Sequence, residues 1–258
     1  MPSSNRASSP RRVTLEVGQI IEVTIEKIAH GGHFIARYEG AVIFVRHGIP
    51  GELVEIIITS VGSSFNRADV LSVKTPSSDR TTPPCRYANR EGCGGCDFQH
   101  ISVTRQRSLK SEVIAEQFSR IAKMELQVEV EEINKPLGWR TRCTSVTTKN
   151  GALGFYQARS HKVIAVDDCR ILVPEMQFAQ LAERRAKGDQ KLEISISNTG
   201  ERSIATANSR DESPMRLTEG VDIAHYVVGE KTFEVSQKSF WQSHKDAPAT
   251  LTKAVLEY

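Results

Sequence analysis

The sequence lacks any apolar run close to the roughly 20 residues that a membrane-spanning helix needs. It also lacks a secretory signal, because residues 1–12 contain arginines but no apolar segment. We read them as a disordered basic tail. The hydrophobic fraction of 39% and the charged fraction of 25% are ordinary for a globular protein, so neither a membrane protein nor a disordered chain is indicated.

A disulfide framework is not indicated either. The chain has five cysteines, an odd number, and clustered cysteines in an intracellular chain more often bind metal or act in catalysis. We therefore expect a cytoplasmic protein. The net charge of +3 permits nucleic-acid binding without requiring it. Whether the chain binds nucleic acid is therefore judged from the local clustering of basic residues.

Four of the cysteines have the spacing of a metal site. Cys85, Cys93 and Cys96 are close together, and Cys169 follows far downstream. Three nearby thiolates and one distant thiolate can hold a 4Fe-4S cluster. Zinc ribbons usually have two CxxC pairs, and this sequence has only one, so the spacing favours a cluster over zinc. Free buried cysteines are the remaining alternative.

The fifth cysteine, Cys143, has a different setting. It lies between Arg140 and Arg142 on a predicted strand. A nucleophilic cysteine needs a base and a group that orients the base, and this stretch offers neither. We interpret Cys143 as a packed strand residue and not as a ligand.

The first part of the chain, residues 13–75, predicts a small antiparallel β-barrel. Five short strands separated by Gly and Pro have about the size of an OB-type barrel, a fold that often binds oligonucleotides. Residues 76–84 are rich in Pro and Ser and predict a linker. The five strands are expected at residues 20–27, 33–37, 40–46, 52–59 and 67–74.

The rest of the chain mixes helices and strands. Helical spacing over residues 102–122 predicts an amphipathic helix with Ser102 as its N-cap. Asn150-Gly151 between two strand-like runs predicts a β-hairpin. Further helices are expected at residues 174–187 and 249–258, and further strands at residues 140–148, 152–156, 192–197, 203–206, 225–228 and 231–235.

Basic residues gather around the cysteines, on the helix that follows them and on the hairpin, and aromatic residues lie between them. Cations for phosphate and rings for base stacking are how single-stranded RNA is commonly held. A solvated charged face and core aromatics are the alternative reading. The hairpin cations are Arg140, Arg142, Lys149, Arg159 and Lys162.

Several motifs together resemble the S-adenosylmethionine-dependent RNA (uracil-5-)methyltransferases that carry an N-terminal TRAM domain. The segment from Ile25 to Arg37 and the run Pro50-Gly-Glu-Leu-Val54 are similar to the TRAM pattern. Cys85 and Cys93-Gly-Gly-Cys96 are similar to the family's cluster signature. Asp168-Cys169 resembles the stretch with the fourth ligand, and Phe240-Trp-Gln242 a motif that contacts the methyl donor.

The resemblance implies roles for individual residues. Cys85, Cys93, Cys96 and Cys169 would bind a 4Fe-4S cluster, and Gln242 would contact S-adenosylmethionine. One departure is Val103, where many members have tyrosine. Contacts with RNA are expected from Arg37, Lys110, Arg140, Arg142, Arg159 and Lys162.

The C-terminal part departs further from the family. A Rossmann-like domain with a Gly-rich turn, a cysteine nucleophile and a carboxylate base would follow. This sequence has no such turn after a strand in its C-terminal part and no cysteine after Cys169. We therefore expect only the N-terminal portion of the enzyme, which binds RNA and the cluster and transfers no methyl group alone. S-adenosylmethionine would bind only in the full-length enzyme.

The predicted fold class is α+β: an OB-like antiparallel TRAM barrel, an α+β iron–sulfur domain and the start of a truncated Rossmann-like domain. The expected partner is ribosomal or transfer RNA with an accessible uridine, with no membrane association and a monomeric state. The alternatives are a stand-alone RNA-binding module and, less favoured, a small electron-transfer protein. The expected domains are residues 1–12 (tail), 13–75 (barrel), 76–84 (linker), 85–220 (cluster and RNA-binding domain) and 221–258 (methyltransferase start).

Overall fold

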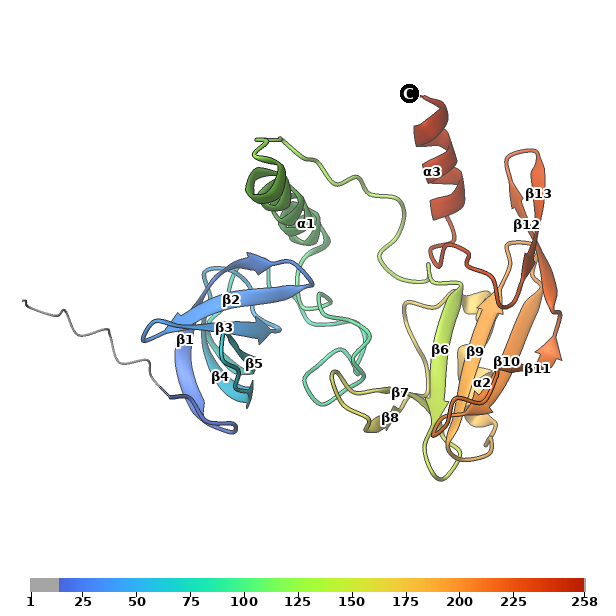
Figure 1. Cartoon of the computed structure of the whole chain (residues 1–258), viewed down its shortest axis with the longest axis horizontal. Helices are drawn as coiled ribbons and strands as arrows, with labels where there is room; N and C mark the ends of the chain where they lie inside the picture. Colours follow the sequence, from blue (N-terminus) through green and yellow to red (C-terminus); the bar gives the residue numbers. More distant parts are fainter. Residues whose placement is uncertain (1–13, 258) are drawn as a thin grey trace, which may run out of the picture. The chain divides into compact units, whose positions relative to one another are not determined.

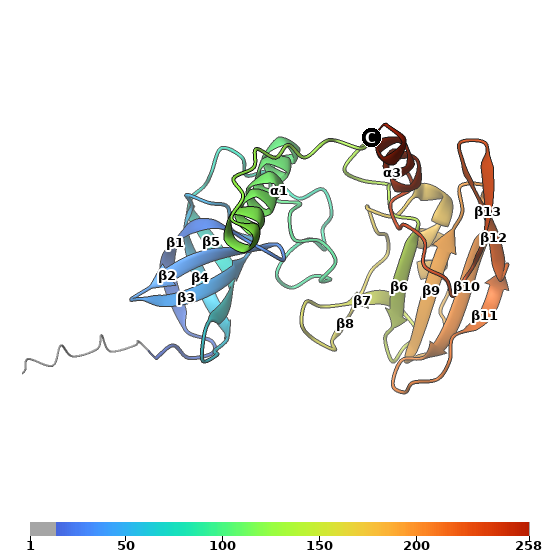
Figure 2. The ribbon, with the colours of Figure 1, turned by 45° about the horizontal axis from the view of Figure 1, so that its top comes forward.

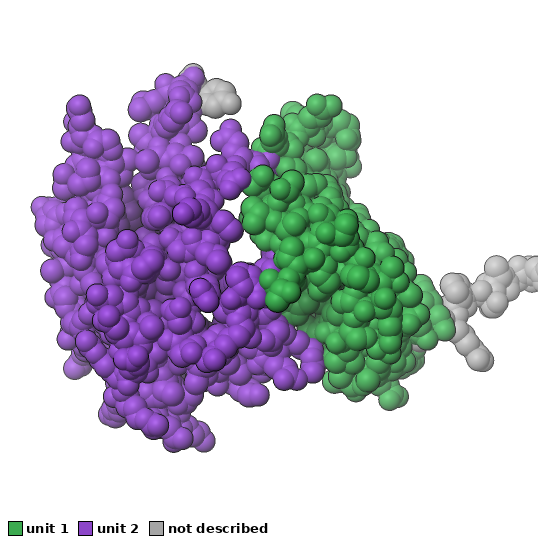
Figure 3. All heavy atoms as spheres, turned by 180° about the vertical axis from the view of Figure 1, so that it is seen from behind, with its two compact units in different colours: residues 1–82, 100–129 green, residues 83–99, 130–258 purple. Residues whose placement is uncertain are grey.

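The computed structural model describes residues 14–257 and divides the chain into two compact units (Figure 3). Residues 1–82 and 100–129 form the first unit, and residues 83–99 and 130–258 form the second. The chain therefore enters the second unit for one loop, returns, and then enters it again. The predicted basic tail, residues 1–12, lies outside the described residues.

The first unit is built on a five-stranded closed barrel with the strand order β1-β2-β3-β5-β4 (Figure 1). Strands β3 and β5 pair in parallel, and the other neighbouring strands pair antiparallel. The prediction of a purely antiparallel barrel was therefore wrong at this pair, because barrel closure brings together strands that local sequence patterns do not connect. The strands are β1 (Ile20–Ala29), β2 (His33–Tyr38), β3 (Ala41–Arg46), β4 (Leu53–Ser60) and β5 (Asn66–Thr75).

Alternation of apolar and polar residues explains the barrel core. In β1, Ile21, Val23 and Ile25 are buried while the residues between them are exposed. Since successive side chains of a strand point to opposite faces, this pattern places one face of each strand inside the barrel. Phe34 from β2 and Ile43 from β3 complete the centre, with no exposed surface.

The described residues of the barrel unit include one α-helix. Helix α1 (Val103–Gln117) begins at the predicted N-cap, where the Ser102 hydroxyl accepts a hydrogen bond from the Arg105 backbone N–H. It continues into the π-helical turn η1 (Phe118–Ala122). Leu109 is the single buried residue of α1, so the helix buries a narrower face than its apolar spacing predicts.

The second unit contains a six-stranded antiparallel sheet in the order β11-β10-β9-β6-β7-β8, most of which is visible in Figure 2. Its strands are β6 (Arg142–Thr147), β7 (Leu153–Tyr156), β8 (Val163–Ala165), β9 (Gln190–Ile196), β10 (Arg202–Asn208) and β11 (Arg216–Gly220). Strands β6 and β7 form the hairpin that Asn150-Gly151 predicts.

Two short helical segments cover the core of this sheet. These are the 3-10 turn η2 (Pro174–Met176) and helix α2 (Phe178–Glu183), whose Met176 and Phe178 pack with Ile194 of β9. The sequence predicts one helix over residues 174–187. The structure interrupts it at Gln177, whose φ of 55° is incompatible with a continuous α-helix.

The C-terminal part forms a separate hairpin and a helix. Strands β12 (Ile223–Val228) and β13 (Lys231–Ser236) pair antiparallel with each other, and α3 (Ala247–Leu256) follows. A Rossmann-like domain would need parallel strands joined by crossover connections. The described residues after 220 instead form this antiparallel hairpin, so the predicted start of a Rossmann-like domain was wrong. No helix within residues 14–257 has the length and apolarity to cross a membrane.

Candidate functional site: a cavity lined by cysteines

The second unit brings the four predicted ligand cysteines to one place. Cys85, Cys93, Cys96 and Cys169 line a cavity of about 260 Å³. The first three lie on the loop of residues 83–99, and Cys169 follows β8. Gln99, Phe155 and Arg140 contribute to the same walls. The structure therefore assembles from distant segments the set that the sequence spacing predicts.

Close backbone packing positions the cysteine loop. The Gly94 N–H donates a 2.9 Å hydrogen bond to the Tyr156 carbonyl at the end of β7. A Cβ atom on Gly94 would lie 2.7 Å from the backbone N and Cα of Ala158, so only glycine allows this approach. A Cβ on Gly95 would meet nothing nearer than the Cys93 Sγ at 3.9 Å. Gly94 therefore allows the cysteine loop to pack closely against the β7–β8 turn.

A second set of contacts connects the loop to the Cys169 segment. Tyr87 donates from its hydroxyl to Asp167 Oδ1 at 2.8 Å, and Arg86 donates to Asp167 Oδ2 at 2.6 Å. The Tyr87 hydrogen bond and the charge of Arg86 lower the pKa of Asp167. Asp168 then accepts a 2.8 Å hydrogen bond from the Cys169 N–H. These contacts hold the fourth cysteine beside the other three.

The thiols are shielded from water, and this changes their acidity. Burial raises the pKa values of Cys93 and Cys96, and it raises the pKa of Cys169 to about 11. A hydrogen bond from the Gln99 side chain acts in the opposite direction on the pKa of Cys96. Burial disfavours the charged thiolate, so these thiols stay neutral at pH 7 unless a metal replaces the proton.

Cys143 lies in the wall of the same cavity, on β6. Its Sγ is 3.9 Å from the Met176 Sδ, and it packs against the core of the sheet. Burial raises the pKa of its thiol to about 12. A thiol with so high a pKa is a poor nucleophile at neutral pH. The sequence did not indicate that Cys143 lies beside the four candidate ligands.

The donor atoms of this cavity fit a thiolate-bound cluster. Iron–sulfur clusters are held by cysteine thiolates, usually four for each cubane. Five thiols line this cavity, those of the four candidate ligands and that of Cys143. Within residues 14–257, no three His, Cys, Asp or Glu side chains converge closely enough to hold a single metal ion. The four candidate ligands therefore have the type and number that a 4Fe-4S cluster requires.

The residues predicted to contact RNA fall into separate groups. Arg159 and Lys162 lie exposed on the β7–β8 turn, which packs against the cysteine loop. Arg140 donates from Nε to the Arg142 carbonyl at 2.9 Å. Arg142 in turn donates to the Gln237 carbonyl at 2.9 Å, so part of each of these guanidinium groups is occupied.

The other two predicted RNA contacts belong to the barrel unit. Lys110 is exposed on α1. Arg37 is exposed on β2 and forms an ion pair with Glu26. Exposed pairs of this kind contribute about 0–1 kcal/mol, so a phosphate can compete for Arg37.

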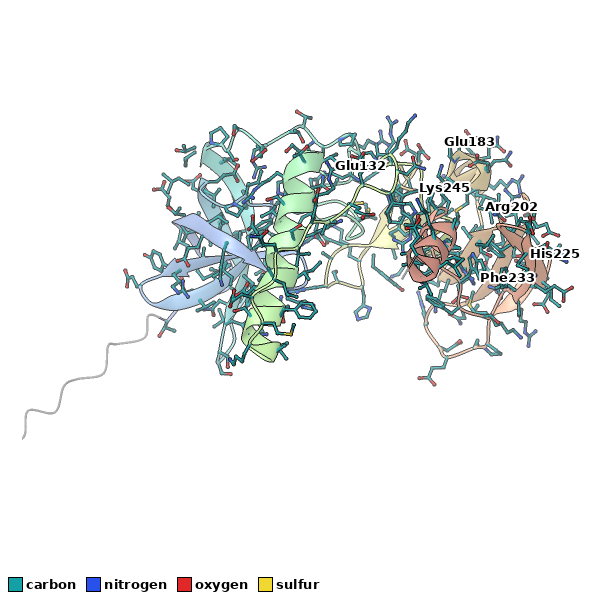
Figure 4. All side chains as sticks on the ribbon, turned by 90° about the horizontal axis from the view of Figure 1, so that it is seen from above. Glu132, Glu183, Arg202, His225, Phe233 and Lys245 are labelled. Atoms are coloured by element: carbon teal, nitrogen blue, oxygen red, sulfur yellow. The ribbon has the colours of Figure 1, made fainter. Side chains whose placement is uncertain are left out.

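Gln242 lines a second cavity in the second unit, of about 610 Å³. Trp241 and Lys245 contribute to the same cavity, and Lys245, labelled in Figure 4, comes shortly before α3. Asn198, in the turn between β9 and β10, also lines this cavity. The cavity combines two aromatic side chains, Tyr226 and Trp241, with several polar groups, as sites for small organic ligands commonly do.

Sequence reasoning missed the residues that hold the cavity together. Asp167 is about eighty positions from Arg86 and Tyr87 in the chain, and a single sequence carries no signal of that contact. Gln99 was also missed as a site residue, although its side-chain oxygen accepts a hydrogen bond from the Cys85 N–H at 3.1 Å and its side chain lowers the pKa of Cys96. Its place three residues after a predicted ligand is the one signal that could have suggested it.

Comparison with known proteins adds a domain assignment. Residues 14–71 match the model of the TRAM domain. This range covers the five strands of the barrel apart from the last residues of β5. The chain therefore carries a TRAM domain.

The whole chain is similar to RNA methyltransferases. It is 31% identical over 254 residues to an uncharacterized RNA methyltransferase of Corynebacterium glutamicum. This match covers 95% of this chain and 61% of that protein. Identity to a similar protein of Streptomyces avermitilis is 35%, over 93% of this chain and 64% of that protein. The 23S rRNA (uracil(1939)-C(5))-methyltransferase RlmD of Shewanella amazonensis is 33% identical over 69% of this chain and 42% of that protein.

The fold is shared with a solved structure. The Pyrococcus abyssi tRNA (uracil-54, C5)-methyltransferase, solved with S-adenosyl-L-homocysteine, matches 91% of this chain and 64% of that chain with a TM-score of 0.62 at 18% identity. The prediction of a truncated methyltransferase domain was wrong, since the match to this solved methyltransferase fold covers 91% of the chain. The chain spans about 60% of the length of the first curated relatives it matches.

Proposed function

We propose that this chain acts in the S-adenosylmethionine-dependent methylation of uridine C5 in RNA, in the cytoplasm and as a monomer. Three observations support the proposal: the TRAM match at residues 14–71, the similarity to proteins named RNA methyltransferases, and the fold shared with a tRNA methyltransferase. The observation that carries the proposal is the convergence of four cysteines on one cavity next to a basic turn. The substrate RNA, ribosomal or transfer, is part of the proposal.

The cysteine cavity is proposed to bind a 4Fe-4S cluster through Cys85, Cys93, Cys96 and Cys169. Four thiols around about 260 Å³ supply the ligands, and Gln99 supplies a nearby hydrogen-bond donor. A bound cluster would connect the loop of residues 83–99 to the segment after β8. This role adds to the Tyr87–Asp167 contact, which already connects the same two segments.

The RNA contacts are proposed at two places. In the second unit, Arg159 and Lys162 are exposed on one turn, while Arg140 and Arg142 keep part of their donors for other groups. In the barrel unit, Arg37 and Lys110 are exposed as well. Cations at these positions would neutralise phosphates, which makes binding depend on salt.

The methyl donor is proposed to lie near Gln242. S-adenosylmethionine supplies an electrophilic methyl group when bound. The cavity beside Gln242 has a volume of about 610 Å³, which is within the size range of cofactor sites. Gln242 would hydrogen bond a polar part of the donor, and Trp241 would cover an apolar part.

The iron proposal is tested by purifying the protein without oxygen. We expect a brown protein with about four irons per chain. The Cys93→Ser variant should lose both colour and iron, and the Cys143→Ser variant, from the same cavity wall, should keep them. Stoichiometric zinc in a colourless wild-type protein would contradict the cluster.

The RNA proposal is tested by fluorescence anisotropy with a labelled transcript of the uridine-containing loops of ribosomal or transfer RNA. We expect the affinity of the wild type for RNA to fall as the salt concentration rises. In the double variant Arg159→Gln with Lys162→Gln, the affinity should depend less on salt, because two phosphate-binding cations are removed. The double variant Lys191→Gln with Lys231→Gln removes two cations from other strands of the same unit and is the matched control. A wild-type protein without measurable RNA binding would contradict the proposed function.

A further inference from the structure

The barrel carries a group of aromatic and cationic side chains on its outer side. Phe44 of β3 contacts Phe65 edge to face, with ring centroids 5.1 Å apart. The guanidinium carbon of Arg67 lies 5.0 Å from the centre of the Phe65 ring. His33 of β2 lies edge to face with Phe44 at 6.4 Å. We call these four residues the aromatic platform.

Strand pairing explains why they meet. Ile35 of β2 is opposite Phe44 of β3, and Phe44 is opposite Arg67 of β5 in the parallel pair. The neighbours of these residues along the strands, Ala36, Val45 and Ala68 among them, point into the barrel and are buried. Because side chains alternate along a strand, the row Ile35–Phe44–Arg67 faces outward.

Phe65 is the unusual member, because it lies in the loop between β4 and β5 and 39% of it is exposed. The loop is held close to itself: a Cβ atom on Gly62 would lie 2.7 Å from the Phe65 carbonyl oxygen. An exposed phenylalanine that is fixed by an edge-to-face ring and a guanidinium loses little freedom when it binds a flat ligand.

The charges on this side of the barrel favour an anionic partner. Arg67 lies over the ring, and Arg37 is two positions after Ile35 on β2, in an exposed pair with Glu26. Asp69 is the acidic residue that follows Arg67 on the same side of β5, and it is opposite Arg46 in the strand pairing. A flat ring next to guanidinium groups suits a nucleobase and its phosphate.

We propose that the aromatic platform binds single-stranded RNA. Phe65 would stack on a base, and Arg67 would lie beside a phosphate of the same RNA molecule. The position agrees with OB-type barrels in general, which bind oligonucleotides on the face of strands 2 and 3 and the adjoining loops. The inference rests on the proposed function for its choice of RNA. It adds a defined set of residues that neither the sequence motifs nor the comparisons assign.

The test uses the full chain and a fluorescein-labelled single-stranded RNA of about twelve nucleotides, a length within the site size of one such barrel. Phe65→Leu keeps apolar volume but removes the ring, and we expect RNA binding to weaken about tenfold with an unchanged salt slope. Arg67→Gln should reduce the salt slope by about one. Phe233→Leu, at an exposed aromatic of β13, is the matched control and should bind as the wild type does.

A second variant does not depend on weakened binding. Phe65→Trp should keep the affinity of the wild type, and its added fluorescence should be quenched when RNA binds, because a base stacks on the indole. If Phe65→Leu binds RNA like the wild type, or if the new tryptophan is not quenched, the platform does not bind RNA.

Two outcomes separate failure of the platform from failure of the proposed function. A wild-type protein that binds no RNA would contradict the proposed function itself. RNA binding by the wild type that is insensitive to Phe65 contradicts only the platform.

Discussion

Arg80 and Glu52 form a buried, bidentate ion pair in the barrel unit. The Nε and one terminal nitrogen of Arg80 donate to the two carboxylate oxygens of Glu52, each at 2.6 Å. Glu52 has no exposed surface, and it also accepts from the backbone N–H groups of Ile49 and Ser77. The pair thus attaches the segment after β5 to the turn before β4.

Removal of this carboxylate charge should destabilise the barrel. We expect Glu52→Gln to lower the free energy of unfolding by about 3 kcal/mol, because it leaves the Arg80 charge without its partner in a largely buried place. Hydrogen exchange of the barrel amides measures this, since both tryptophans lie in the other unit. Glu26→Gln, which breaks the exposed pair with Arg37, should cost less than about 1 kcal/mol. Equal effects of the two variants would contradict the prediction.

The two glycines between Cys93 and Cys96 should tolerate substitution differently. Gly94→Ala would place a Cβ 2.7 Å from the Ala158 backbone, so the cysteine loop has to move and the iron content should fall severalfold. Gly95→Ala meets only the Cys93 Sγ at 3.9 Å and should keep most of the iron. The test is to measure the iron content of both variants after parallel purification without oxygen. Iron loss in Gly95→Ala alone would contradict the geometry.

Asn198 should hold the C-terminal hairpin to the central sheet. Its amide donates to the Val227 carbonyl at 2.7 Å and accepts from the Val227 N–H at 2.9 Å. Asn198→Ala removes both hydrogen bonds, so we expect a loss of about 1–2 kcal/mol in the protection of the Val227 amide from hydrogen exchange. Asn208→Ala removes one exposed contact with the Arg210 N–H and is the control. Unchanged protection at Val227 in Asn198→Ala would show that other contacts hold the hairpin.

Stability of the second unit should depend on pH through His244. The ring stacks on Trp139 with centroids 5.2 Å apart, and burial together with the Lys245 charge lowers the pKa of His244. As the pH falls below about 6.5, the unfolded chain binds a proton on this histidine before the folded protein does. The free energy of unfolding should therefore decrease until the pH passes the folded pKa.

The measurement compares urea unfolding of the wild type and His244→Gln by tryptophan fluorescence between about pH 7.5 and pH 5. The wild type should lose stability relative to the variant as the pH falls. His30→Gln, at an exposed position before the Gly31-Gly32 turn, controls for the loss of an imidazole. A constant difference between wild type and His244→Gln across this range would be inconsistent with the lowered pKa.

Local sequence patterns determined most of the secondary structure. Alternation in Ile20–Ala29 and the Gly31-Gly32 turn predicted β1 and β2 within two residues of their observed ends, because a half-buried strand and a tight turn each leave a local signature. The Ser102 cap was predicted for the same reason. Strands β8 and β11 were missed, since one is three residues long and the residues of the other are all exposed.

Only the tertiary structure decided the pairings between distant segments. The sequence by itself determined which four cysteines were candidates, but the Tyr87–Asp167 hydrogen bond and the Gly94–Ala158 approach decided that they line one cavity. The parallel pairing of β3 with β5 likewise placed Phe44 opposite Arg67 and near Phe65. Such contacts depend on the closure of a barrel or sheet over many residues, which local propensity does not encode.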